Sequence, residues 1–125
     1  MNAEFAKFGT DQVVRLRTPQ DSGRRAHPDA AAKARIRMED IDAPVLVAGG
    51  ERDDVWASGE MARTIAERRA AAGRETVLFD LPDAGHALSG TGEGEPKGDD
   101  GAANLAAQKV VWPATLAVFA RTLKR

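Results

Sequence analysis

Two apolar segments that flank a helical one constrain this sequence more than any other feature. The first, "APVLVAGG" at residues 43–50, is short and β-branched and ends in two glycines, and the second, "ETVLFDL" at residues 75–81, has a similar character. Such runs are typical of buried parallel strands that lead into loops. A strand–helix–strand unit is normally right-handed, and both strands end at the same edge of the sheet. We therefore expect an α/β fold of short parallel strands with flanking helices.

The helix between the two strands has recognisable ends. Ser58 is placed to cap its N-terminus, and Met61 and Ile65 give it one apolar side among alanines. Gly73, followed by Arg74, is typical of a helix C-terminus. The order along the chain is therefore strand, acidic loop, helix, strand and histidine loop.

Residues 1–40 form a poorly defined N-terminal segment, in contrast to residues 41–125. Within it, "VVRLRT" alternates weakly like a short strand, "PQDSGRRAHPD" is rich in turn residues, and "AAAKARI" favours a helix. Both Ser22 and His27 lie in the turn-rich part. We therefore expect the α/β unit to occupy residues 41–125.

The C-terminal part of the sequence predicts a loop and a helix. "GTGEGEPKGDDG" is too rich in glycine and charge to pack, which indicates a flexible surface loop. Residues 102–123 are helical by composition, and Pro113 should break or kink this helix near Trp112. Apolar residues available for burial on it are Val110, Val111, Leu116, Phe119 and Leu123. We expect Trp56 and Trp112 to anchor the core.

Composition excludes several classes of function. The 125 residues are 42% hydrophobic and 30% charged, which fits one domain, and the net charge of -1 gives no reason to expect a nucleic-acid or membrane partner. The sequence has no cysteine and only two histidines, so we expect no disulfide, no zinc site and no cofactor. No apolar run approaches a signal peptide or a membrane span, and the cytoplasm is the default location.

The two loops that follow the strands carry complementary groups. "GGERDDVWAS" places Asp53 and Asp54 behind the first strand, and "PDAGHALSG" places His86 behind the second. A carboxylate beside an imidazole fixes its tautomer and stabilises its protonated form, as in a nucleophile–histidine–acid triad. The residues alone leave open which aspartate is involved. They also leave open that the acids merely favour the following helix N-terminus and that His86 is a structural residue.

Three segments resemble, in order, the C-terminal part of the acyl-CoA thioester hydrolase and bile-acid-CoA:amino-acid N-acyltransferase family. They are "IDAPVLVAGGERDDVWAS", "PDAGHALSG" and "GAANLAAQKVVWPATLAVF", and the resemblance runs from about residue 41 to 123. Its distinctive pieces are Gly-Glu-x-Asp followed by Trp-x-Ser, then Ala-Gly-His, then an alanine-rich stretch that leads into Trp-Pro. The resemblance implies the C-terminal segment of an α/β-hydrolase fold.

The resemblance also implies a site and a substrate. By motif position, the catalytic acid of the family falls on Asp53 and the catalytic base on His86, and Asp54 is a neighbour. The implied substrate is a small-molecule acyl thioester of coenzyme A. The serine or cysteine nucleophile of the family lies in a Gly-x-Ser/Cys-x-Gly elbow, which this sequence lacks. Its serines, Ser22, Ser58 and Ser89, do not match that elbow.

We therefore expect this chain to be the last third of a hydrolase and to be inactive alone. The missing N-terminal part of the same enzyme, or self-association through an exposed strand, would complete its sheet. A carboxylesterase or dienelactone-hydrolase-like enzyme that uses the same pair is an alternative. A second alternative, from a different class of protein, is a non-catalytic interaction module that keeps the hydrolase scaffold.

Overall fold

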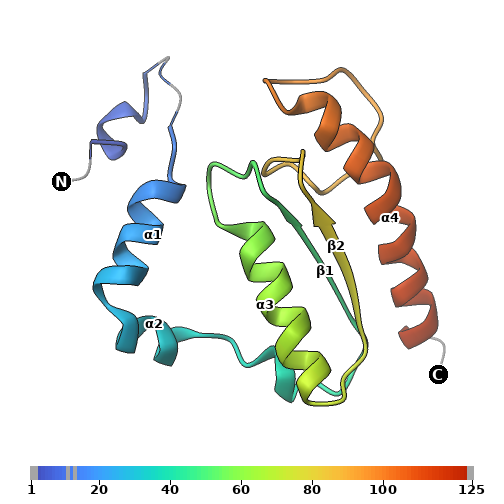
Figure 1. The fold of residues 1–125 in the computed structure, drawn as a ribbon. Helices are drawn as coiled ribbons and strands as arrows, with labels where there is room; N and C mark the ends of the chain where they lie inside the picture. Colours follow the sequence, from blue (N-terminus) through green and yellow to red (C-terminus); the bar gives the residue numbers. More distant parts are fainter. Residues whose placement is uncertain (1–2, 11, 13, 124–125) are drawn as a thin grey trace.

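The computed structural model describes residues 3–10, 12 and 14–123 as a small α/β unit with an N-terminal helical segment (Figure 1). Its elements in chain order are η1 (Phe5–Lys7), α1 (Arg17–Ala26), α2 (Pro28–Ala34), η2 (Met38–Asp40), β1 (Val45–Gly50), α3 (Ser58–Ala71), β2 (Thr76–Leu81) and α4 (Gly101–Leu123). None of the helices in the described part of the chain is long and apolar enough to cross a membrane.

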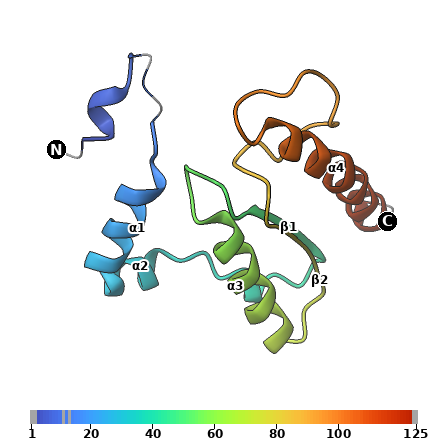
Figure 2. The same ribbon diagram turned by 45° about the horizontal axis from the view of Figure 1, so that its top comes forward.

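The strand–helix–strand unit expected from the sequence is present. β1 and β2 pair in parallel, in a register that runs from Val45 opposite Thr76 to Gly50 opposite Leu81. α3 packs along both strands and α4 contacts β1, and in both views the strands lie between these two helices (Figures 1 and 2). Gly73 has a φ of 69° just beyond α3, as a helix-ending glycine requires. The α/β prediction is therefore confirmed.

The N-terminal segment differs from its sequence-based prediction. Residues 17–26, interpreted as weak strand and turn, form α1, and Ser22 lies inside this helix with its hydroxyl donating to the Thr18 carbonyl at 2.8 Å. Pro19 falls in the first turn, where no intrahelical partner for its missing N–H is needed, so it does not prevent the helix. His27 does lie at a junction, between α1 and α2. Residue 13 of the weak strand lies outside the described residues.

The C-terminal part also departs from expectation at two points. α4 continues through Pro113 without a break. Because Pro113 has no N–H, the carbonyl of Lys109 has no donor within the helix. Lys109 is exposed, so water can satisfy that carbonyl. The glycine-rich loop is exposed over residues 93–99, but its third residue is packed: Gly92 is buried and its N–H donates to Gln108 Oε1 at 3.1 Å.

The core contains small residues. Its buried hydrophobic side chains are Ala57, Ala62, Ala84, Ala107, Val111 and Val118. Trp56 and Trp112 are 45% and 41% exposed, so the expectation that they anchor the core is wrong. Of the α4 residues expected to be buried, only Val111 is; Val110, Leu116, Phe119 and Leu123 are exposed. These large side chains are exposed because no described element covers them. Burial depends on a neighbouring element as well as on side-chain hydrophobicity.

Arg69 is the largest fully buried side chain among the described residues, and it joins the elements at the end of the sheet where both strands begin. From the last turn of α3, its guanidinium donates to the carbonyls of Met38, Ile41, Ala43 and Glu75 and to the Thr76 hydroxyl, at 2.6–2.9 Å. All five guanidinium hydrogens thus have acceptors, which is the condition under which a buried polar group is tolerated. Arg69 thereby fixes the segment before β1 to the start of β2.

Candidate active site

The carboxyl ends of β1 and β2 bring together the two residues expected from the sequence. Asp53 lies in the acid loop, residues 51–57, and His86 lies in the histidine loop, residues 82–100. Nδ1 of His86 is 3.2 Å from Oδ2 of Asp53, within the hydrogen-bonding reach that the topology predicts. Asp54 instead points to Arg15, 3.7 Å away, in an exposed ion pair. Of the two aspartates left open by the residues alone, Asp53 is therefore the partner of His86.

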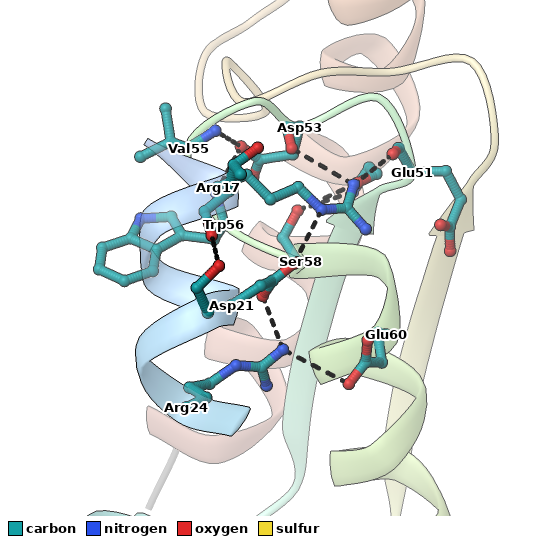
Figure 3. Close-up of polar contacts among 12 residues, drawn as sticks. Arg17, Asp21, Arg24, Glu51, Asp53, Val55, Trp56, Ser58 and Glu60 are labelled. Atoms are coloured by element: carbon teal, nitrogen blue, oxygen red, sulfur yellow. Dashed lines mark hydrogen bonds and ion pairs between the residues drawn. The ribbon is translucent and has the colours of Figure 1, made fainter. Parts of the chain in front are cut away.

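The Asp53 carboxylate is held from two sides. Asp53 is only 2% exposed, and its Oδ1 accepts the backbone N–H groups of Val55 at 2.8 Å and Trp56 at 3.0 Å (Figure 3). Its other oxygen, Oδ2, is left for His86. Burial raises the pKa of Asp53, but hydrogen bonds outweigh it and hold the pKa below its ordinary value. The bonds that lower it come, largest first, from Ser58, Trp56, Val55 and His86. Asp53 is therefore ionised at neutral pH.

This contact defines which nitrogen of His86 is available for chemistry. An ionised carboxylate only accepts hydrogen bonds, so the contact requires a proton on Nδ1 and leaves Nε2 as an acceptor. The His86 side chain is 56% exposed, whereas that of Asp53 is 2% exposed. A buried acid behind a solvent-facing imidazole is the arrangement that accepts a proton at Nε2 and stabilises the resulting imidazolium.

Ser58 secures the acid loop in a way that the sequence did not indicate. It is the first residue of α3, and the residue before it, Ala57, has no side-chain capping bond, so the predicted capping role is wrong. Besides helping to lower the pKa of Asp53, the Ser58 hydroxyl lies against the end of β1, 3.1 Å from the backbone nitrogen and 3.2 Å from the carbonyl oxygen of Gly50. It thereby satisfies backbone groups of Gly50 that no other strand among the described residues pairs.

The glycines at the end of β1 permit this close packing. A Cβ on Gly49 would lie 2.2 Å from the Ser58 carbonyl oxygen, and a Cβ on Gly50 would lie 2.2 Å from that of Ala84. The N–H of Arg52 donates to the same Ala84 carbonyl at 3.0 Å. The acid loop and the histidine loop are thus in direct backbone contact, which fixes the distance between their functional side chains.

Two polar side chains of α4 hold the histidine loop. Oδ1 of Asn104 accepts the Gly85 N–H at 2.7 Å, and Nε2 of Gln108 donates to the Ala87 carbonyl at 2.9 Å. Both residues are buried, and they hold the backbone immediately before and after His86. Sequence reasoning missed them, although two amides four residues apart in an alanine-rich helix were a detectable signal.

The serines and His27 lie apart from the Asp53–His86 pair. Among the described residues, no serine hydroxyl hydrogen-bonds to His86; that of Ser22 bonds within α1, that of Ser58 bonds to Gly50, and Ser89 is an exposed residue of the histidine loop. His27 is exposed at the α1–α2 junction. In the part of the chain that the structure describes, no three histidine, cysteine or acidic side chains gather as a metal-binding group.

Comparison with known proteins identifies the family. The family described as BAAT / acyl-CoA thioester hydrolase C terminal matches residues 5–90, which is more than half of the chain. The match includes α1, α2, the acid loop and the histidine loop as far as residue 90, and it ends before α4. The resemblance noted in the sequence runs instead from 41 to 123. Neither the curated proteins nor the solved structures yield a match. The chain therefore belongs to the BAAT / acyl-CoA thioester hydrolase C-terminal family, whose domain is of the α/β-hydrolase type.

Proposed function

We propose that this chain supplies the acid and the base of a nucleophile–histidine–acid triad in an acyl-CoA thioester hydrolase. His86 is the base and Asp53 is the acid. The observation that carries this proposal is the 3.2 Å contact between Nδ1 of His86 and Oδ2 of Asp53, in a chain of this family. The surrounding contacts support it, because both loops are held by their backbones and the imidazole is 56% exposed.

In the proposed reaction, a serine or cysteine outside this chain attacks the thioester carbonyl while Nε2 of His86 takes its proton. The tetrahedral intermediate collapses, the carbon–sulfur bond breaks, and His86 returns the proton to the departing coenzyme A thiolate. In the second half, His86 deprotonates water, which attacks the acyl-enzyme and releases the carboxylic acid and the nucleophile. Asp53 stays ionised throughout and stabilises the imidazolium. In a transferase, an amino-acid amine would replace water.

Turnover of acyl-CoA tests this assignment. We propose to read the coding sequence upstream of Met1 for an in-frame Gly-x-Ser-x-Gly or Gly-x-Cys-x-Gly and to express the joined polypeptide. We expect His86→Ala and Asp53→Asn each to lower kcat by roughly 10⁴-fold, since a triad acts as a unit. His27→Ala is the matched control and should leave kcat unchanged, because His27 lies exposed at the α1–α2 junction. Wild-type turnover by His86→Ala would overturn the proposal.

The chain alone should hydrolyse acyl-CoA no faster than buffer. A histidine and an acid only activate a nucleophile, so both the covalent step and oxyanion stabilisation must come from another segment. The assay includes Ser22→Ala, Ser58→Ala and Ser89→Ala in parallel. Turnover above background that one of these substitutions abolishes would place the nucleophile within this chain and contradict the proposal.

A further inference from the structure

Arg17 connects α1 to the acid loop through three backbone carbonyls. Its Nη1 donates to the Glu51 carbonyl at 2.8 Å and lies 3.4 Å from the Asp53 carbonyl oxygen, and its backbone N–H donates to the Asp54 carbonyl at 2.7 Å. Figure 3 shows the Arg17 side chain reaching from α1 across to this loop. The polypeptide on both sides of the Asp53 side chain is therefore held from α1.

The other contacts of Arg17 orient its guanidinium. Nε lies 3.6 Å from Oδ2 of Asp21, one turn further along α1, so that carboxylate faces one side of the guanidinium while the loop carbonyls face another. Asp21 also pairs with Arg24 at 2.8 Å, and Arg24 in turn lies 3.6 Å from Glu60 on α3. A planar guanidinium donates in several fixed directions at once, which suits it to gathering carbonyls of one loop.

We propose that Arg17 is a positioning residue, which holds the acid loop so that the Asp53 carboxylate meets His86. This inference rests on the proposed function and extends it to α1, an element outside the strand–helix–strand unit. Arg17 does not contact either functional side chain. It acts through the loop backbone, whose Val55 and Trp56 N–H groups bind Oδ1 of Asp53 and thereby aim Oδ2 at the imidazole.

Nuclear magnetic resonance on the whole 125-residue chain tests the proposal without any catalytic assay. The carboxyl carbon of Asp53 is titrated in wild type, Arg17→Ala, Arg17→Lys and Arg25→Ala, and amide hydrogen exchange is followed at Val55 and Trp56. Each variant keeps the backbone N–H bond of residue 17, so only the side chain is tested. Arg25→Ala is a matched control, because it removes the same charge from an exposed position in the last turn of the same helix.

In Arg17→Ala, we expect the pKa of Asp53 to rise toward its ordinary value, because the hydrogen bonds that lower it become less persistent. Exchange of the Val55 and Trp56 amides should accelerate at least tenfold, while that of the β2 amides stays at the wild-type rate. Arg17→Lys should recover part of both effects, since an ammonium group still donates to carbonyls. Arg25→Ala should match the wild type.

Two results would overturn the positioning role. One is wild-type titration and exchange in Arg17→Ala; the other is a raised pKa of Asp53 with unchanged amide exchange, which would mean that Arg17 acts through its charge alone. If Arg17→Ala does not fold, the Arg17→Lys comparison decides on the same two readouts. Failure of the proposed function is separate, because it is detected as turnover that does not depend on His86.

Discussion

Gly50 brings the acid loop and the histidine loop together at the scale of a single residue. A Cβ at this position would meet two backbone carbonyl oxygens of the histidine loop, 2.2 Å away at Ala84 and 2.6 Å away at Gly85. Its φ is not in the left-handed region, so the requirement is for space. Backbone atoms cannot move aside as the end of a flexible side chain can, and any added methyl group must push the loops apart.

Gly50→Ala should therefore destabilise the chain by roughly 1–3 kcal/mol, as overpacking does. It should also separate Asp53 from His86. Urea unfolding measures the first effect, and Gly23→Ala is the matched control, since a Cβ there meets nothing within 4 Å and the residue lies inside α1. Equal stability of Gly50→Ala and wild type would contradict the close approach.

The prediction that Asp53 and His86 lie within hydrogen-bonding reach of each other is confirmed, because topology alone places them together. Each follows a parallel strand, and such strands end at one edge of a sheet. Sequence-based prediction failed for Ser58, whose hydroxyl binds the end of β1, and it missed the supporting side chains Arg17 and Asn104. Those roles depend on contacts between elements far apart in the sequence, which local patterns do not specify.

At the scale of elements, Arg69 of α3 replaces the apolar contacts that a larger core would provide. Its guanidinium binds four carbonyls from the segment before β1 and the start of β2, with no carboxylate among its hydrogen-bond partners. Its removal would take the donor from all four of these partly buried carbonyls, and an unpaired polar group costs more than the bond itself contributes.

Arg69→Ala should lower the free energy of unfolding by at least about 1–3 kcal/mol, the cost of leaving a polar group without its partner. Chemical denaturation measures this, and Arg68→Ala is the control on the same turn of α3. Arg68 is exposed, so its removal should change stability by no more than about 0.5 kcal/mol. Similar stabilities of the two variants would show that the Arg69 bonds do not hold the strands.

Prediction of elements was accurate where a strong apolar pattern existed. β1, α3 and β2 lie where the sequence indicated, because their apolar spacing and terminating glycines agree. α1 was missed because it has few apolar residues and contains Pro19 and Gly23, which are common in turns. A proline in the first turn is nevertheless compatible with a helix, and the contacts of Arg17 with the acid loop supply tertiary support that composition does not reveal.

At the scale of the whole molecule, β1 has one edge that no described strand covers. The N–H of Val45 and that of Glu51 face β2, so by alternation those of Leu46 and Ala48 face outward. Beside this edge runs an open groove lined by apolar residues that include Trp56, Met61 and Ile65. Trp56 was expected in the core, and its exposure here follows from the uncovered edge.

We expect the isolated chain to self-associate through this edge, since unpaired strand edges recruit other strands. Ala48→Pro should shift sedimentation toward monomer, because it removes an outward N–H while the residues that pair with β2 keep theirs. Wild type at the same concentration is the control, and circular dichroism verifies that the variant stays folded. A folded Ala48→Pro chain that associates as strongly as wild type would exclude this edge as the interface.

The central claim is that this chain holds His86 ready as a base, with its Nδ1 proton directed to Asp53. Nitrogen-15 chemical shifts of the imidazole, measured at a pH where the ring is neutral, report directly which nitrogen carries the proton. We predict the Nδ1–H tautomer for His86 in wild type and a change in the tautomer balance in Asp53→Asn. A wild-type ring protonated on Nε2, or one unaffected by Asp53→Asn, would contradict the account.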